Sequence, residues 1–185
     1  MNTKSIQKFI LQSEGNFHIA AAVAETWPEA RTQLMSSFLD RLEILLMRKL
    51  KGWKPWRDSN FFKATAGYYI TKPEWGESYW IGFECYPDGS RVDIGITWET
   101  DNTRKQALAE LLTAAQRIYP SAKIWSNPRE KWVYAMLRSP EPDWSKPDAL
   151  WRMHKDPEFV TDLANQLLEI VDVSEHIIDR LVRKK

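Results

Sequence analysis

The sequence predicts an α+β domain, with a mostly antiparallel sheet of about five strands and helices packed mainly on one face. Apolar residues recur at helical spacing in several segments, and short runs rich in aromatic and β-branched residues alternate apolar with polar positions. The expected order is helices, three strands, a helix, two strands and helices. The helix between the third and fourth strands leaves open whether one strand is parallel.

The N-terminal third of the chain is expected to be helical. Thr26 and Glu29 have the spacing of a capping box, and Pro28 suits a first helical turn. We therefore expect a helix from about residue 27 to 50. The segment before it, FHIAAAVAE, and residues 3–12 are also expected to form helices.

Three strands should follow, at 62–72, 78–86 and 91–98. The apolar positions of the second and third strands share one face, which should lie in the core. The turn-forming residues PDGS join these two strands and place Gly82 opposite Gly95 and Glu84 opposite Asp93. Opposed glycines leave a flat spot that a helix, a ring or a ligand can approach closely.

The remaining elements complete a single domain, residues 1–185. Thr103 and Gln106 can cap a helix over 103–118, and Asp156 can cap a long final helix. The other expected elements are strands at 122–126 and 131–138 and a short helix at 147–154. The parts of the domain are an α+β core (1–138), a Pro-rich linker (139–148) and C-terminal helices packed on the core (149–185).

Composition indicates a water-soluble, cytoplasmic protein. The net charge is +1, so no global field favours nucleic acid or an anionic membrane. No apolar run is long enough for a transmembrane helix, and the N-terminus has no secretory signal. Cys85 is the single cysteine, which excludes an internal disulfide and a cysteine-based metal cluster.

The ten tryptophans suggest a protein-binding function. Any single tryptophan is expected in the core, yet ten are too many for all to be buried, and exposed ones anchor interfaces. We expect a protein partner, or a second copy, to bind at the sheet face or at loops 51–58 and 73–80. The candidate anchors are Trp53, Trp56, Trp75, Trp80 and Trp144.

The stretch KLKGWKPWRDSNFFK supports an alternative, a nucleic-acid-associated accessory protein. Lys51, Lys54 and Arg57 can neutralise phosphates while neighbouring aromatic rings stack on bases. The same residues also suit a helix end that turns into a sheet. Charge is uneven: residues 48–63 are basic, whereas residues 64–102, which include the first hairpin, are acidic. An acidic hairpin argues against nucleic acid on that face.

Recognisable catalytic motifs are missing from the sequence. It contains no Gly-rich phosphate loop, no metal-binding histidine spacing and no nucleophile elbow. Glu84 and Asp93 suggest a cation or metal site, or a carboxylate pair with a shifted pKa. The alternative is that a lysine or arginine on a neighbouring strand, such as Lys63 or Lys72, neutralises the pair, or that the pair stays hydrated. We expect no cofactor and no metal, and the sequence favours a protein without enzymatic activity.

The block VAETWPEARTQLMSSFLDRLEILLMRKL, followed by YYITK, SYWIGFE and SRVDIGITW, resembles the C-terminal portion of some bacterial proteins of the PD-(D/E)XK nuclease-like superfamily. The resemblance covers residues of about 20–138. Pro87 and Asp88 match the first two letters of the nuclease motif, but Tyr86 stands where its lysine is needed. The resemblance therefore implies an accessory, non-catalytic part of a bacterial or phage protein.

Overall fold

A computed structural model of the chain describes residues 3–59, 61–62, 65–76, 78–99, 105–126, 130–138 and 141–183. Its elements, in chain order, are α1 (Thr3–Ile10), α2 (Glu14–Lys49), β1 (Lys54–Arg57), β2 (Ala66–Thr71), η1 (Pro73–Trp75), β3 (Tyr79–Cys85), β4 (Val92–Glu99), α3 (Lys105–Ile118), β5 (Lys123–Ser126), β6 (Glu130–Met136), α4 (Pro147–Lys155) and α5 (Pro157–Val182).

The strands form one sheet in the order β1-β2-β3-β4-β6-β5, and every described pairing is antiparallel. This confirms the α+β prediction, with six strands instead of about five. The strand that the sequence did not predict is β1, which contains Pro55. Proline cannot donate to a strand ladder, so it is tolerated at the sheet edge where β1 lies. The register of β3 on β4 is confirmed, since Gly82 pairs with Gly95 and Glu84 with Asp93.

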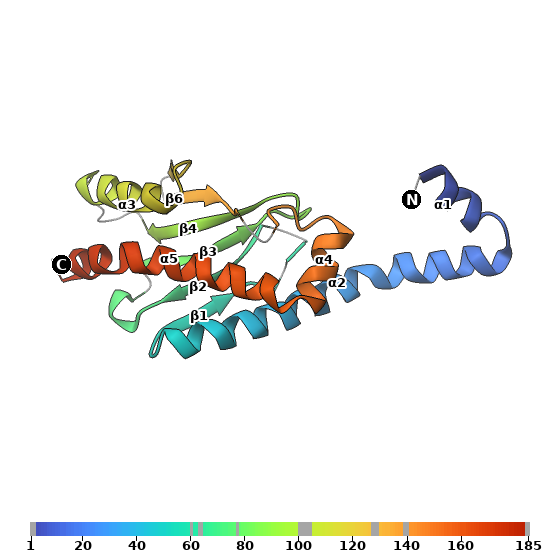
Figure 1. Cartoon of the computed structure of the whole chain (residues 1–185), viewed down its shortest axis with the longest axis horizontal. Helices are drawn as coiled ribbons and strands as arrows, with labels where there is room; N and C mark the ends of the chain where they lie inside the picture. The colour runs from blue at the N-terminus through green and yellow to red at the C-terminus, as the bar shows by residue number, and fades with distance from the viewer. Residues whose placement is uncertain are drawn as a thin grey trace.

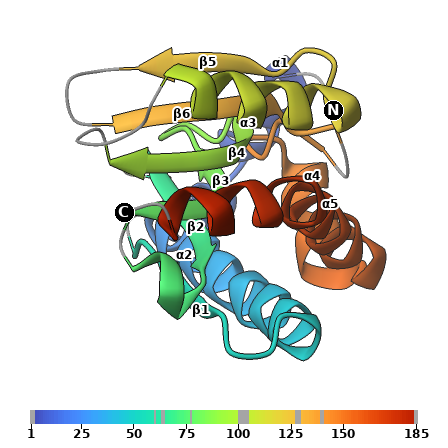
Figure 2. The same ribbon diagram turned by 90° about the vertical axis from the view of Figure 1, so that its left-hand side faces the viewer.

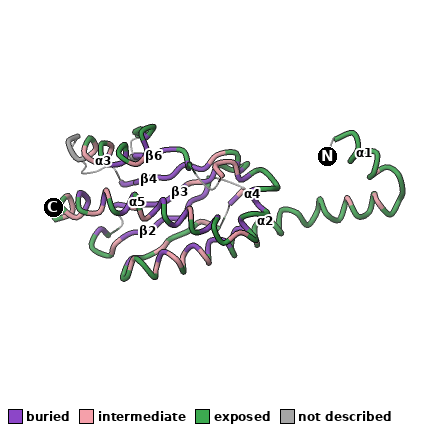
Figure 3. The backbone as a smooth tube through the Cα atoms, viewed as in Figure 1, coloured by how far each residue is buried: buried purple, intermediate pink, exposed green. Residues whose placement is uncertain are grey.

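Helices α2, α5 and α3 lie side by side over one face of the sheet, from the β1 edge to the β5 edge (Figure 2). The buried residues of the core lie along the strands and recur along α5 and the second half of α2 (Figure 3). Helix α5 begins where predicted, because the Asp156 side chain accepts a hydrogen bond from the Glu158 amide, 2.9 Å away.

The predicted start of the long N-terminal helix is wrong. The Thr26 hydroxyl donates to the Ala22 carbonyl one turn earlier, 2.9 Å away, so Thr26 lies inside the helix instead of capping it. Helix α2 begins after Ser13, whose side chain accepts a hydrogen bond from the Asn16 amide. The alanine-rich segment before Thr26 has high helix propensity and carries the helix through Pro28. As a result α2 projects beyond the body of the molecule, with α1 folded back at its tip (Figure 1).

The Pro-rich segment before α4 is held tightly against the sheet. Trp144 is fully buried and packs edge-on against Phe38 and Phe83, with ring centroids 5.7 and 5.4 Å apart. Its backbone amide donates to the Gly89 carbonyl, 2.6 Å away, in the β3–β4 turn. Through these contacts of Trp144, the described residues 141–146 hold the start of α4 against the β3–β4 hairpin.

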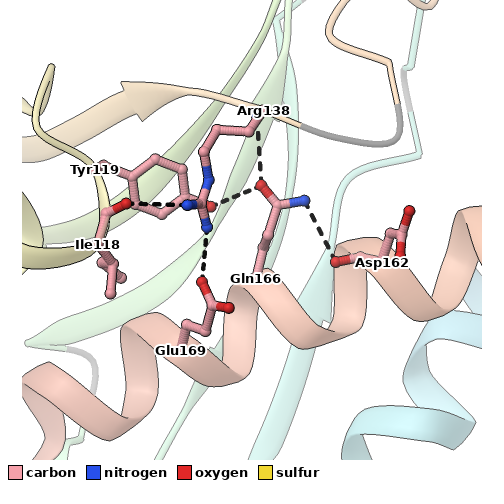
Figure 4. Close-up of polar contacts among 6 residues, drawn as sticks. All are labelled: Ile118, Tyr119, Arg138, Asp162, Gln166 and Glu169. Carbon is pink, nitrogen blue, oxygen red and sulfur yellow. Dashed lines mark hydrogen bonds and ion pairs between the residues drawn. The ribbon is translucent and has the colours of Figure 1, made fainter.

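A buried amide joins the ends of α3 and β6 to α5 (Figure 4). The side-chain oxygen of Gln166 accepts hydrogen bonds from the Tyr119 hydroxyl, at 2.8 Å, and from the Arg138 amide, at 3.3 Å. The Arg138 guanidinium donates to the Ile118 carbonyl and pairs with Glu169, 2.7 Å away. Burial raises the pKa of Tyr119 to about 12, so its hydroxyl stays protonated as a donor. Each named polar group has a partner, which indicates a structural role.

Two buried tyrosines test the value of this hydrogen bonding. The hydroxyl of Tyr68 is buried without a hydrogen-bond partner in the described part of the chain, whereas that of Tyr119 donates to Gln166. We expect Tyr119→Phe to lower the free energy of unfolding by about 1 kcal/mol, and Tyr68→Phe to leave it unchanged or raise it slightly. Urea denaturation of the two variants beside the parent protein measures both; equal losses would contradict the assignment.

Candidate functional site on the outer sheet face

The face of the sheet opposite α2, α3 and α5 is the candidate site, and we call it the outer sheet face. Side chains alternate along a strand, so the register that buries Ile81 and Phe83 turns their neighbours to this side. By their strand positions, its central residues are Trp56, Tyr69, Trp80, Gly82, Glu84, Asp93, Gly95, Trp125, Trp132 and Tyr134.

Aromatic rings cross this face in a connected row. The ring of Trp56 lies 5.5 Å from Tyr69 and 6.5 Å from Trp80, measured between centroids. Tyr69 in turn lies 6.2 Å from Trp132, which contacts Tyr134 at 6.4 Å. The row therefore runs from the β1 edge to β6. The two outermost tryptophans stand open to solvent: Trp56 is 48% exposed and Trp125, on β5, is 46% exposed.

Glycines form the floor beneath these rings. A Cβ atom at Gly82 would lie 2.2 Å from the Tyr68 carbonyl oxygen and 2.6 Å from the Tyr69 ring. One at Gly67 would lie 2.2 Å from the same ring, and one at Gly95 would lie 2.1 Å from a β6 carbonyl oxygen. The predicted close approach at the opposed glycines is confirmed, and the group that approaches Gly82 is the ring of Tyr69.

The opposed carboxylates at the end of this face each have a partner. Tyr69 donates its hydroxyl to Glu84, 2.6 Å away, and the Arg91 Nε donates to Asp93, 2.8 Å away. Burial raises the pKa of the Asp93 carboxyl, although Arg91 acts in the opposite direction.

The cation that neutralises Asp93 comes from its own strand end, because Arg91 lies two residues earlier. Of the two predicted cations, Lys72 instead pairs with Glu175 and Asp179, and Lys63 lies outside the described residues. Within the described ranges, no group of three or more His, Cys, Asp or Glu side chains is placed to hold a metal ion.

A pocket of about 320 Å³ opens beside the carboxylates. Its walls are aromatic and its floor is acidic; the lining residues are Thr65, Glu84, Tyr86, Asp93, Trp125, Trp132 and Tyr134. The Arg91 guanidinium lies over the rings of Tyr86 and Tyr134, 5.5 and 5.9 Å from their centroids. The walls thus already hold one cation by ring contact, an interaction that aromatic faces offer to ammonium and guanidinium groups.

A second cleft, of about 500 Å³, lies where α5 ends near η1. It brings together three residues that the sequence singled out, Lys51, Trp53 and Trp75. The two tryptophans pack edge-on at 4.9 Å, and the Trp75 Nε1 donates to Asp179, 2.7 Å away. The charged groups at the centre of this cleft are paired with one another, which marks it as a packed junction between helices.

The predicted exposure of the candidate tryptophans is wrong for three of the five. Trp53, Trp75 and Trp144 are buried. The rings of Trp53, which follows α2, and Trp75, in η1, pack on each other, and the ring of Trp144, which precedes α4, packs on Phe38. Trp56 is exposed and Trp80 is half-buried, and these two meet on the outer sheet face. The expectation that ten tryptophans cannot all be buried is confirmed.

The three predicted basic residues do not form one surface. Lys51 and Lys54 are exposed, the former at the second cleft and the latter on the outer sheet face. Arg57 points to the helical side of the sheet and pairs with Asp40 on α2, 2.7 Å away. The sheet pleat separates Lys54 from Arg57, as residues an odd number apart on a strand point to opposite faces.

Sequence reasoning missed the exposed tryptophans Trp27, Trp125 and Trp151. Trp125 lies in the predicted strand 122–126, which the structure places at an edge of the sheet. Its partner Trp132 is buried on the same face. Strand order decides which of the two is covered, and local sequence does not contain strand order.

Comparisons with protein-family models, with curated proteins and with solved structures found no match. The resemblance to nuclease-like proteins therefore stays a prediction. None of the described helices combines the length and apolar character needed to cross a membrane.

The close contact between Gly82 and the ring of Tyr69 predicts the effect of a substitution on the free energy of unfolding. Gly82→Ala forces a methyl group into the Tyr68 carbonyl and the Tyr69 ring, so we expect the free energy of unfolding to fall by about 2 kcal/mol or more. Gly15→Ala is the matched control, since its Cβ meets only the Ser13 hydroxyl at 3.9 Å within helix α2. It should be neutral or stabilising. Urea denaturation compares the two; equal effects would show that the ring does not rest on Gly82.

The second cleft predicts a pH-dependent contribution to stability. Partial burial alone would raise the pKa of Asp179, but hydrogen bonds from Trp75 and Lys72 outweigh it and lower the pKa below its ordinary 3.8. A lowered carboxyl pKa stabilises the folded state above about pH 4, and this contribution is lost as the pH falls through the folded pKa.

We expect Asp179→Asn to lower the free energy of unfolding by about 1–2 kcal/mol at pH 7, and the difference from the parent to be smaller at about pH 3. Asp172→Asn, at an exposed position on the same helix, controls for the loss of one charge. Denaturation curves at both pH values measure the effect. A deficit that persists unchanged at low pH would contradict the pairing.

Proposed function

We propose that this protein is a non-enzymatic, cytoplasmic binding protein that docks a segment of a protein partner on the outer sheet face. The observation that carries the proposal is the aromatic row, which starts at the half-exposed Trp56 on β1 and reaches β6, where the half-exposed Trp125 of the edge strand β5 is the register partner of Trp132. Exposed tryptophan and tyrosine are the side chains most often found as anchors of interfaces. The buried thiol of Cys85 suits a reducing compartment.

The pocket beside the row indicates the chemistry of the partner. Glu84 and Asp93 supply two carboxylates to its floor, Arg91 neutralises one of them, and aromatic rings form its walls. Such a pocket favours a cation with an apolar stem over an anion. The partner segment therefore presents a lysine or arginine next to an apolar side chain.

The two edges of the sheet differ in what they offer to an incoming strand. The edge strand β1 carries Pro55 and two basic residues, which discourage pairing with another strand. The opposite edge strand, β5, is exposed along its four residues and contains Ile124 and Trp125. In the described part of the chain it pairs only with β6. A partner strand added beside β5 would bring alternate side chains next to Trp125 and the pocket.

The nucleic-acid alternative has less support. Stacking on bases requires exposed rings near cations, but Trp53 is buried and Arg57 is paired with Asp40. On the outer sheet face the exposed ring of Trp125 lines the pocket that contains Glu84 and Asp93, whose carboxylates repel phosphate, and the exposed ring of Trp56 has one exposed cation, Lys54, on its own strand. This alternative keeps a distinct signature, because phosphate-driven binding weakens steeply as salt rises.

Selection from a random peptide library displayed on phage tests the proposal with the whole protein as bait. We expect enriched peptides to contain lysine or arginine beside an apolar residue. Trp125→Ala should weaken the binding of a synthetic enriched peptide by about 30-fold or more, the effect typical of an interface anchor. Titration followed by the indole N–H signals in NMR spectra measures the affinity.

Trp151→Ala is the matched control, because Trp151 is an exposed tryptophan on α4, away from the sheet. It should leave peptide affinity unchanged. Equal losses in both variants, or no enriched peptide, would contradict the proposal. Salt-sensitive binding of a poly-dT oligonucleotide that exceeds peptide binding would favour the alternative.

A further inference from the structure

The pocket beside the carboxylates on the outer sheet face is built mainly from aromatic rings. Four of its seven lining residues are aromatic: Tyr86, Trp125, Trp132 and Tyr134. They come from separate parts of the sheet, because Tyr86 follows β3, Trp125 lies on β5, and the other two lie on β6. A group that enters the pocket is therefore offered aromatic contact from several chain segments.

The strand register explains why a pocket lies at this place. Gly95 on β4 pairs with Tyr134 on β6, and Asp93 lies two residues before Gly95, so all three belong to the outer sheet face. Because glycine carries no side chain, nothing from β4 stands beside Tyr134 at this position. The resulting pocket, of about 320 Å³, is at the small end of the range for ligand sites and suits a single side chain or head group.

The inside of this pocket is acidic. The carboxylates of Glu84 and Asp93 line it, whereas the neighbouring cations Arg91 and Lys123 do not. Arg91 reaches Asp93 from the end of the same strand, and Lys123, the register partner of Tyr134, is exposed. A charged group that enters the pocket therefore meets carboxylates first, which favours a cation and disfavours an anion.

The hydrogen bonds of the two carboxylates indicate which kind of cation fits. Glu84 accepts from the Tyr69 hydroxyl, 2.6 Å away, and Asp93 accepts from the Arg91 Nε, 2.8 Å away. A lysine ammonium brings three N–H donors, and each donor that leaves water without finding a new acceptor costs free energy. A trimethylated ammonium has no N–H donor, and aromatic rings are the surface that such groups prefer. The pocket therefore fits a methylated ammonium better than an unmodified one.

We propose that this pocket binds a methylated ammonium group, and that a methylated lysine of the docked partner segment carries it. The source of the group rests on the proposed function, because a segment added beside β5 would bring its side chains next to Trp125. The chemistry of the group rests on the pocket alone, so the two can be tested separately.

Choline and its neutral isostere 3,3-dimethylbutan-1-ol test the chemistry with the full chain. The two molecules have the same shape but differ in charge, since a carbon atom replaces the quaternary nitrogen. We expect choline to bind about 10-fold more tightly or better, in titrations followed by the indole N–H signals in NMR spectra. Trp125→Ala should weaken choline binding at least several-fold, and Trp151→Ala, away from the sheet, should leave it unchanged.

Glu84→Gln separates the contribution of the carboxylate from that of the rings. The amide keeps an oxygen that accepts the hydrogen bond of Tyr69, while the pocket loses one negative charge. We expect this variant to bind choline several-fold more weakly and the neutral isostere as the parent does. Equal binding of choline and the isostere by the parent, or a choline affinity that neither Trp125→Ala nor Glu84→Gln lowers, would overturn the inference.

A lysine-containing peptide selected against the protein tests the source of the group. We expect the peptide to bind about 10-fold more tightly or better when its lysine is trimethylated, and Trp125→Ala to remove this preference. Equal binding of the two forms would overturn the inference and leave the proposed docking of a protein segment intact. Choline binding without any peptide binding would overturn both that docking and the methylated-lysine source, and would assign the pocket to a free quaternary ammonium compound.

Discussion

The pairing of β3 with β4 is the constraint on which the rest of the structure depends. Its register places Ile81, Phe83 and their partners under the helices and places the glycines and carboxylates on the outer sheet face. A slip of one residue would exchange the two sets, burying charge and exposing apolar side chains. The hydrophobic effect therefore fixes this register, and the register in turn determines which side chains can form a site.

The outer sheet face shows how an aromatic surface can be ordered without a covering layer. Glycines on neighbouring strands remove the side chains that would lift the ring of Tyr69, so the ring lies on the backbone and reaches both Trp132 and Glu84. The carboxylates are held by a hydroxyl and a guanidinium, and so are not left unpaired in an apolar setting. The result is a pocket lined by aromatic rings and by two partnered carboxylates.

The body of the molecule and its N-terminal arm, residues 3–30, differ in how their helices are covered. In the body, the stripe of α2 is buried by α5, α4 and the sheet, and satisfied groups such as Gln166 hold the layers together. In the arm, the same helix continues without such cover, because alanine-rich sequence favours helix regardless of packing. The molecule thus joins a body with its own core to a helical arm whose large apolar side chains are exposed.

The sequence by itself determined the elements that local signals specify: the helices with long apolar stripes, the hairpin register set by PDGS, and the cap at Asp156. The prediction from sequence was wrong at Thr26, because the helix propensity of the alanine-rich segment before it outweighed the capping-box signal. Only the tertiary structure decided which tryptophans are buried and that Arg91, not a lysine, holds Asp93. Burial and pairing depend on strand order and on contacts between segments distant along the chain, whereas composition and spacing report only the residues nearby.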